Sequence, residues 1–203
     1  EMVTEAEALD ERERLAKMMG VDLDELDNLI DSSLTYSRFE REQPELNLTP
    51  VDFEPWLNDE VDSLRILGRN HEITVDTTQL PEGLQVELDL KSMPYAITNL
   101  LRNALKYAKS RIVVSAEVIG NSILVHVDDD GIGIPEAERQ RVFSAFTRLD
   151  RSRDRATGGY GLGLAIVRLV LEQHGGSAVA EASPLGGARF SLRWPLLQSV
   201  TES

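Results

Sequence analysis

Two glycine clusters within one short stretch carry the residues best suited to binding chemistry. The first, Asp130-Gly-Ile-Gly-Ile-Pro135, follows an alternating apolar segment, 123–128, which predicts a strand. The second, Thr157-Gly-Gly-Tyr-Gly-Leu-Gly-Leu164, opens into an apolar run with helical spacing, 165–171. Glycines at a helix start let backbone N–H groups approach a phosphate, and the helix N-terminus favours negative charge. One such cluster is most often a turn, but the two together predict a nucleotide site.

Two asparagines share one face of a helix that is predicted over residues 91–108. Asn99 and Asn103 are four residues apart, and Lys106 and Tyr107 follow within the next turn. An amide among apolar neighbours is costly to bury without a hydrogen-bond partner. Either the pair is structural, with both amides satisfied, or Asn103 gives an oxygen to Mg²⁺, which prefers such hard ligands beside phosphates.

The composition excludes several classes of function. The chain has 203 residues, a net charge of −14 and no cysteine. The charge argues against nucleic acid as the main partner, and the lack of cysteine excludes disulfides and thiolate metal sites. No apolar run approaches the roughly 20 residues that are needed to span a bilayer. The chain begins inside a helical pattern, so we expect it to be part of a longer protein.

A long helix is predicted ahead of a compact domain. Between residues 9 and 39, apolar residues recur three and four apart, as on the seam of a helical bundle; they include Ala16, Met19, Leu23, Leu26 and Ile30. A single helix cannot bury that seam, so it either folds back on the domain or packs against a partner chain, and we favour the partner chain. Pro44 ends the helix. The predicted parts are a stalk, 1–43, a domain, 44–197, and a tail, 198–203.

The domain is predicted to contain both strands and helices. Asp52 is the expected N-cap of one helix, and Pro135 opens another. The expected strands are 46–51, 72–77, 84–88, 111–119, 122–128, 178–182 and 188–195, and the expected helices are 52–67, 91–108, 135–143 and 165–171. This order predicts an α+β fold, a two-layer sandwich in which three helices cover a mixed sheet.

Four motifs in the domain resemble those of a known family. Asn99–Tyr107, Asp130–Pro135, Phe143–Phe146 and Gly159–Leu164 are similar, in order and spacing, to the N, G1, F and G2 boxes of sensor histidine kinases. The nucleotide domain of that family is shared with gyrase-, HSP90- and MutL-type ATPases. Within the family, the arginine-rich segment 148–155 and the ending Gly187-Ala-Arg-Phe-Ser resemble those of RstB-type kinases.

The resemblance implies ATP and Mg²⁺ as ligands. Asp130 would accept the adenine amino group, Gly133 would give the base room, and Asn103 would hold Mg²⁺ with support from Asn99. Lys106 would meet phosphate and Tyr107 would flank the adenine. The nucleotide-contacting residues implied in this way are Asn99, Asn103, Lys106, Tyr107, Asp130, Gly131, Gly133, Ile134, Gly159, Tyr160, Gly161, Leu162, Gly163 and Leu164.

The resemblance also implies a lid over the nucleotide, from about residue 147 to 160. Phe143 and Phe146 would anchor its base, unless they are ordinary core aromatics. The lid contains Arg148, Arg151, Arg153 and Arg155. An arginine of this set would contact phosphate, although an arginine-rich polar loop is by default simply solvated.

The phosphoaccepting histidine box of the family is absent from this chain. His71, His126 and His174 are the histidines present. Two stand in strand patterns and one ends a helix before Gly175-Gly176, so we expect all three to be structural. No catalytic residue is therefore assigned, and we expect the chain to bind ATP without phosphorylating itself.

The function that the resemblance implies is that of the ATP-binding catalytic part of a two-component sensor kinase. The whole kinase would transfer the γ-phosphoryl group to a histidine and then to an aspartate of a response regulator. It would be an inner-membrane protein and a homodimer through its stalk helices, with this chain as its cytoplasmic domain. The alternatives are an ATP-hydrolysing machine of the same fold and a non-catalytic nucleotide-sensing or dimerisation module. Hydrolysing relatives place a glutamate four residues before the metal asparagine, where this chain has Asn99.

Overall fold

A five-stranded mixed sheet forms the centre of the computed structural model, which describes residues 26–27, 29–41, 45–68, 70–149 and 160–197. The strand order is β2-β4-β5-β7-β6; β2 runs parallel to β4, and every other neighbouring pair is antiparallel. The strands are β2 (Glu72–Gln79), β4 (Arg111–Ile119), β5 (Ser122–Asp129), β6 (Ser177–Ala182) and β7 (Ala188–Pro195). A separate antiparallel pair is formed by β1 (Leu48–Asp52) and β3 (Gln85–Asp89).

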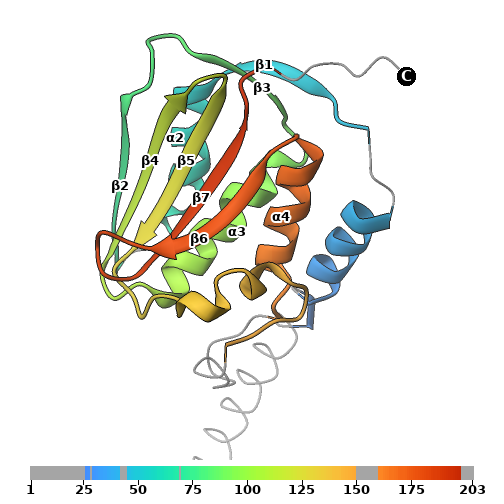
Figure 1. The fold of residues 1–203 in the computed structure, drawn as a ribbon, viewed down its shortest axis with the longest axis vertical. Helices are drawn as coiled ribbons and strands as arrows, with labels where there is room; N and C mark the ends of the chain where they lie inside the picture. The colour runs from blue at the N-terminus through green and yellow to red at the C-terminus, as the bar shows by residue number, and fades with distance from the viewer. Residues whose placement is uncertain (1–25, 28, 42–44, 69, 150–159, 198–203) are drawn as a thin grey trace, which may run out of the picture.

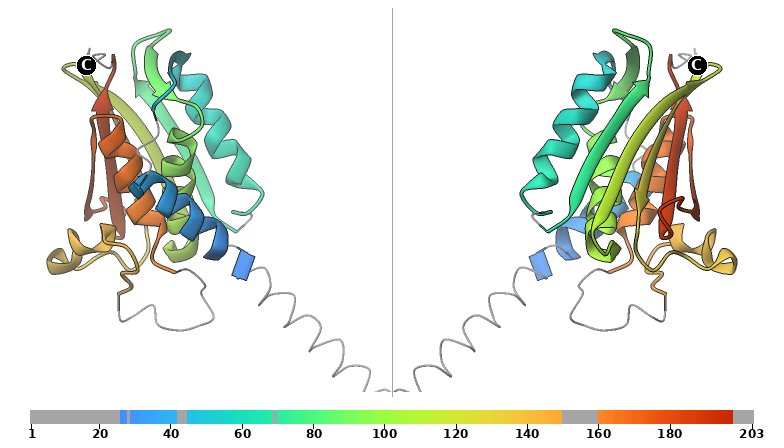
Figure 2. Two further views of the ribbon diagram at one scale, coloured as in Figure 1. Left: turned by 90° about the vertical axis from the view of Figure 1, so that its right-hand side faces the viewer. Right: turned by 90° about the vertical axis from the view of Figure 1, so that its left-hand side faces the viewer.

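Helices cover one face of this sheet (Figures 1 and 2). They are α2 (Phe53–Arg65), α3 (Met93–Tyr107) and α4 (Gly163–Gln173). Each presents apolar residues three and four apart, such as Leu57, Val61 and Leu64 of α2, and these side chains are buried against the sheet. The predicted two-layer α+β sandwich is therefore confirmed.

The core lies between the helices and the inward-facing residues of the strands. On β5 these are Ile123, Val125 and Val127, alternating with side chains of the outer face as a strand requires. Phe190, Leu192 and Trp194 of β7 and Ile112 and Val114 of β4 continue the same layer. The largest wholly buried side chain, Trp194, contacts the ring of Phe53 at 5.8 Å between centroids.

Two local expectations need correction. The helix expected over 135–143 is instead two 3₁₀ turns, η1 (Glu136–Glu138) and η2 (Arg141–Phe143). Only Val142 and Phe143 of these turns are buried, so the segment has no apolar stripe along which a longer helix could pack. Asp52 does occupy the N-cap position of α2, but its side chain makes no capping bond there; it accepts a hydrogen bond from the Gln85 side chain.

The N-terminal helical segment, residues 29–41, folds back on the domain at its C-terminal end. Phe39 is buried and its ring meets that of Tyr95 at 5.9 Å, while the Gln173 side chain donates to the Phe39 carbonyl at 3.1 Å. Leu26, Ile30 and Leu34 remain exposed. The buried end agrees with a helix that folds back on the domain, and the exposed residues leave room for a partner chain. The part of the predicted helix before residue 26 lies outside the described residues. None of the described helices has the length and apolar character to cross a membrane.

His174 joins the C-terminal end of α4 to the end of β3. Its imidazole is fully buried; Nε2 accepts from the backbone N–H of Asp89 at 3.1 Å, and Nδ1 donates to the carbonyl of Val170 at 2.7 Å. Only the neutral ring with its proton on Nδ1 can do both. Burial lowers the pKa of His174, against a weaker opposing effect of the hydrogen bond to Val170 and the Asp89 charge. The expected structural role of this histidine agrees with these contacts.

We expect mild acid to destabilise the fold through His174. Because its folded pKa lies below the unfolded value of about 6.5, the unfolded chain takes up the proton first. Stability is then lost as the pH falls from about 6.5 toward the folded pKa. The amide of His174→Gln can make both hydrogen bonds without titrating, so its stability deficit relative to wild type should shrink as the pH falls from about 8 to about 5. Thermal unfolding measures this difference, and a deficit independent of pH would contradict the assignment.

Candidate nucleotide-binding site

A cavity of about 850 Å³ lies where the end of β5 meets the N-terminus of α4. Its walls come from α3, the end of β5 and the loop after it, residues 160–164, and the start of β7. The volume falls in the range of roughly 300–1,000 Å³ that is typical of small-molecule sites.

Most residues predicted from the sequence to bind nucleotide line this cavity. They come together from two helices and two loops; they are Asn99, Asn103, Lys106, Tyr107, Gly133, Ile134, Tyr160, Gly161, Leu162, Gly163 and Leu164. Asp130 and Gly131 do not line it, and Gly159 lies outside the described residues.

Asp129 is a buried carboxylate in the cavity wall. It is 2% exposed, and its Oδ1 accepts from the N–H groups of Gly131 at 2.8 Å and Ala188 at 3.1 Å. Burial raises the pKa of Asp129, and the neighbouring charges of Asp130 and Asp128 raise it further, against the two backbone hydrogen bonds. A buried carboxylate at a cavity surface can accept a hydrogen bond from a ligand where water does not compete.

Asp130, the residue expected to read the base, has a different place. Its Oδ1 accepts from the N–H groups of Lys109 at 2.8 Å and Ser110 at 3.0 Å, and its Oδ2 accepts from the Ser110 hydroxyl at 2.8 Å. These bonds, those from Ser110 foremost, hold the pKa of Asp130 well below its usual range. The carboxylate therefore fixes the loop between α3 and β4 and does not face the cavity.

The strand period of β5 contains a signal for Asp129. The inward residues of β5 alternate at 123, 125 and 127, and one more step of the same period reaches residue 129. The expected strand ended at residue 128, and the contact with the base was therefore expected of Asp130. In the structure β5 continues through Asp129.

The asparagine face of α3 is turned toward the N-terminus of α4. The Asn99 side-chain amide donates to the Tyr95 carbonyl at 2.7 Å. A Cβ on Gly163 would stand 2.8 Å from Asn99 Oδ1, so glycine allows α4 to begin directly against this amide. Asn103, one turn further along α3, lines the same cavity. Lys106 Nζ lies 5.0 Å from the centre of the Tyr107 ring, a cation–π distance.

Cationic side chains predominate among the charged residues of the cavity wall. Asp129 and Glu138 are its carboxylates, whereas its cations are Arg102, Lys106, Arg139, Arg141 and Arg148. The chain as a whole carries a net charge of −14. Positive charge gathered in a cleft of an acidic protein suits a polyanionic ligand such as a polyphosphate.

The two phenylalanines of the expected lid base have separate surroundings. Phe143 is a core aromatic, buried edge-to-face against Phe190 at 6.1 Å. Phe146 is 67% exposed, has a positive φ of 60°, and meets the ring of Tyr36 at 6.5 Å. Its N–H donates to the Gly161 carbonyl at 2.9 Å, which ties it to the cavity wall.

The helical segment itself reaches the cavity. Ser32 is part of the lining, one helical turn before Tyr36. Sequence reasoning missed this residue because nothing in a helix pattern tells which distant site it will face. Arg148 also lines the cavity, whereas Arg151, Arg153 and Arg155 lie outside the described residues. In the described part of the chain, no histidine contributes to the lining.

Comparison with known proteins decides among the nucleotide-binding families. Residues 88–198 match the family model described as histidine kinase-, DNA gyrase B-, and HSP90-like ATPase. The chain belongs to this ATPase family.

Relatives within the family are sensor kinases. The chain is 40% identical over 187 residues to the sensor protein RstB of Escherichia coli K12, covering 92% of this chain and 43% of RstB. It is 33% identical over 196 residues to the sensor-like histidine kinase SenX3 of Mycolicibacterium smegmatis, covering 96% of this chain and 51% of SenX3. The chain thus spans about half the length of these relatives.

A solved structure extends the comparison. Full-length ShkA in complex with AMPPNP superposes with a TM-score of 0.75 at 27% identity, covering 87% of this chain and 37% of ShkA. Taken with the relatives, this places the chain among the sensor histidine kinases of the ATPase family, where it corresponds to the ATP-binding catalytic part.

The cavity fits the ligand of the family. Glycine is required at Gly161, whose φ is +74° and where a Cβ would stand 2.6 Å from the Thr147 carbonyl oxygen. Glycine therefore lets this loop pack directly against residue 147 of the cavity wall, next to the N-terminus of α4, which favours a negatively charged group such as a phosphate. No cluster of three acidic or histidine side chains that could hold a metal occurs among the described residues. A metal in this site would thus depend on an amide oxygen, water and the phosphates themselves, as Mg²⁺ permits.

We expect Gly161→Ala to weaken ATP by about tenfold or more, because its Cβ would push Thr147 out of the cavity wall. Gly83→Ala is the matched control. Gly83 has a similar φ of +68° but open space around it, so alanine there adds only the backbone strain of about 1–2 kcal/mol. Calorimetric titration with ATP separates the two variants, and equal affinities would contradict the close approach at Gly161.

Proposed function

We propose that this chain is the catalytic ATP-binding part of a sensor histidine kinase that transfers the γ-phosphoryl group of ATP to a histidine and then to a response-regulator aspartate. The observation that carries the proposal is the joint wall of the cavity. The asparagine face of α3, the glycine start of α4 and the buried Asp129 meet around one space of nucleotide size. Phosphoryl transfer needs mainly positioning and charge neutralisation, which this wall can supply.

Asp129, rather than Asp130, is proposed to read the adenine. Its carboxylate lies in the cavity wall and is oriented by two backbone N–H groups, so it can accept the exocyclic amino group of adenine. Gly133, Ile134 and Tyr107 line the same cavity and would flank the base. Asp130 keeps a supporting role, because its bonds to residues 109 and 110 hold the start of β4 against the end of β5.

The phosphates are proposed to lie toward α4. The N-terminus of α4 favours negative charge, and Lys106, Arg102 and Arg148 supply positive charge in the lining. Asn103 would give its side-chain oxygen to Mg²⁺, with Asn99 behind it. Bound Mg²⁺ would neutralise phosphate charge during transfer. An imidazole supplied by an acceptor helix needs no protein base, because its neutral nitrogen is already nucleophilic.

The amide at position 99 favours a kinase over an ATP-hydrolysing machine. Hydrolysis requires a group that removes a proton from water, and an amide cannot act as that base. The Asn99 amide is in addition engaged with Tyr95 of its own helix.

The exposed side chains of Leu26, Ile30 and Leu34 are compatible with the proposed homodimer through stalk helices. We place the whole protein in a membrane, with this part on its cytoplasmic side.

Base recognition can be tested with two neighbouring substitutions. Asp129→Asn should weaken ATP by about 1–3 kcal/mol, because it removes the charge from the hydrogen bond to the adenine amino group. GTP should lose little, since it offers a carbonyl at that position. Asp130→Asn serves as the control that keeps the shape of a neighbouring side chain and should change ATP affinity much less. Calorimetry with both nucleotides decides, and a larger effect of Asp130→Asn would return the role to that residue.

The reaction can be tested by supplying the missing acceptor. The chain is mixed with Mg²⁺, γ-labelled ATP and a peptide that carries the histidine box of a sensor kinase. We expect acid-labile label on the peptide, none on the chain itself, and a release of free phosphate much slower than transfer. Asn103→Ala should abolish the transfer while leaving thermal unfolding nearly unchanged.

Two other outcomes would point to the alternatives. Phosphate release without peptide labelling would indicate an ATP-hydrolysing protein. Bound ATP with neither reaction, even at high peptide concentration, would indicate a nucleotide-sensing module.

A further inference from the structure

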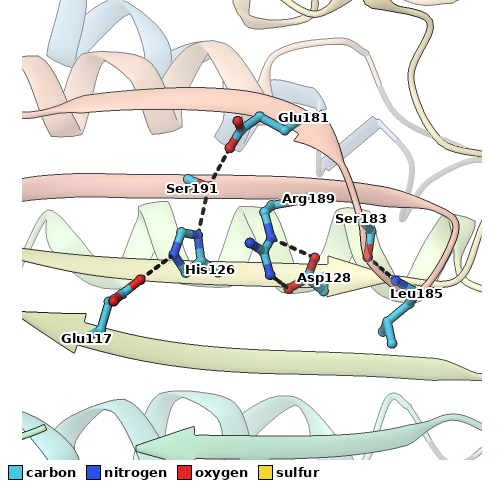
Figure 3. A network of polar contacts seen from close by, with 8 residues as sticks. All are labelled: Glu117, His126, Asp128, Glu181, Ser183, Leu185, Arg189 and Ser191. Carbon is cyan, nitrogen blue, oxygen red and sulfur yellow. Dashed lines mark hydrogen bonds and ion pairs between the residues drawn. The ribbon is translucent and has the colours of Figure 1, made fainter. Parts of the chain in front are cut away.

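An ion pair lies on the outer face of the sheet, directly behind the base-reading carboxylate. Asp128 is 3% exposed although it points away from the helices. Arg189 Nε donates to its Oδ1 at 2.9 Å, and Nη2 donates to its Oδ2 at 2.8 Å, so the pair is bidentate (Figure 3). This geometry is the strongest form of an arginine–carboxylate contact.

The ion pair and the cavity wall are built from consecutive residues of the same two strands. Asp128 stands opposite Arg189 in the β5–β7 ladder. The next residue of β5, Asp129, points to the other face, where its Oδ1 accepts from the N–H of Ala188, the residue before Arg189. Each strand thus contributes one residue to the outer ion pair and one to the inner hydrogen bond.

We propose that Arg189 is a positioning residue for base recognition: through Asp128 it fixes the end of β5 against β7 and offsets the negative charge beside Asp129. This inference rests on the proposed function, because it assumes that Asp129 accepts the adenine amino group in its ionised form. Arg189 does not line the cavity and is not assigned a contact with the nucleotide.

Charges around the two carboxylates make the offset necessary. Asp128, Asp129 and Asp130 are consecutive, and the charges of the outer two raise the pKa of the buried middle one. The hydrogen bond from Arg189 to Asp128 raises the pKa of Arg189, and the negative charges of Glu181 and Glu117 raise it further. His126 lies in the same outer network, between Ser191 at 2.7 Å and Glu117 at 3.4 Å (Figure 3). On the cavity side the charged residues are Arg102, Lys106, Glu138, Arg139, Arg141 and Arg148.

The alternative is an ion pair that only joins two strands. Removal of such a pair would lower stability at every pH without changing how ATP affinity depends on pH. If Arg189 positions Asp129, its removal should also change how ATP affinity depends on pH. With Arg189 gone, the unpaired Asp128 charge should raise the pKa of Asp129, and ATP affinity should then be lost at a higher pH on acidification, because ionised Asp129 accepts the amino group more strongly than the neutral acid does.

The experiment measures the Kd of ATP by calorimetry between about pH 7.5 and pH 4.5, with the whole chain. We expect Arg189→Met to move the acid loss of affinity upward by about one pH unit, which is about tenfold in Kd on that slope. Asp128→Asn/Arg189→Met should return it to the wild-type position, because the unpaired charge is gone. Asp128→Asn alone should move it downward. The titration of ATP itself is common to all variants and cancels in the comparison.

Arg193→Met is the matched control, since Arg193 lies on the same strand and the same face but is exposed and pairs opposite Leu124. It should leave the pH profile unchanged. If Arg189→Met does not fold, Arg189→Lys keeps the charge without the bidentate geometry, and Asp128→Asn still carries its prediction of opposite sign.

An unchanged profile in Arg189→Met, or a double variant as impaired as the single one, would overturn the proposal and leave a joining ion pair. Failure of wild type to bind ATP at any pH would instead overturn the proposed function. The ratio of ATP to GTP affinity gives a second readout, which should fall in Arg189→Met and recover in the double variant.

Discussion

Burial of one carboxylate at the end of β5 is the constraint on which the rest of the site depends. An ionised carboxylate taken out of water costs several kcal/mol unless hydrogen bonds replace the water. Asp129 receives those bonds from Gly131, in the loop after β5, and from Ala188, the first residue of β7. Gly187 has no room for a Cβ, because its backbone lies against this carboxylate. The charge therefore holds the loop after β5 and the start of β7 together, and both segments contribute to the cavity wall.

The three consecutive aspartates show how neighbouring residues of one type can serve different purposes. Asp128 pairs with an arginine across the sheet, Asp129 meets backbone N–H groups beside the cavity, and Asp130 holds the loop before β4. Strand alternation separates the first two, and the end of the strand separates the third. Each of the three negative charges has its own hydrogen-bonding partners, and these offset the repulsion between the charges. Of the three, the middle carboxylate alone lines the cavity.

Contact between the helical segment and the cavity wall joins the two parts of the described chain. Phe39 and the Gln173 side chain hold the segment to the C-terminal end of α4. Near the other end of α4, Tyr36 meets Phe146, whose N–H is bonded to Gly161 of the cavity wall. The segment is thus packed along the helix whose start forms the proposed phosphate site.

Much of the fold followed from local patterns. Period-two alternation gave the β4–β5 hairpin, helical spacing gave α2, α3 and α4, and the order of these elements was enough for the two-layer sandwich. Spacing also placed Asn99 and Asn103 on one face, since four residues make about one helical turn. Glycine clusters marked both loops beside the cavity because a side chain at Gly131 or Gly161 would collide with backbone. These features depend on neighbours in the sequence, so the sequence alone could determine them.

Other features were decided only when distant segments met. The alternation of β5 reaches Asp129, but whether the strand continues that far depends on its pairing with Ile112 of β4, a contact between distant segments that the local pattern does not state. Ser32 enters the cavity wall because Phe39 and Tyr36 find rings on other elements, which fixes the rotation of their helix. Arg189 gains its place behind the base site from a partner 61 residues away. A sequence determines which residues can make such contacts, but the packing of the core determines which contacts are made.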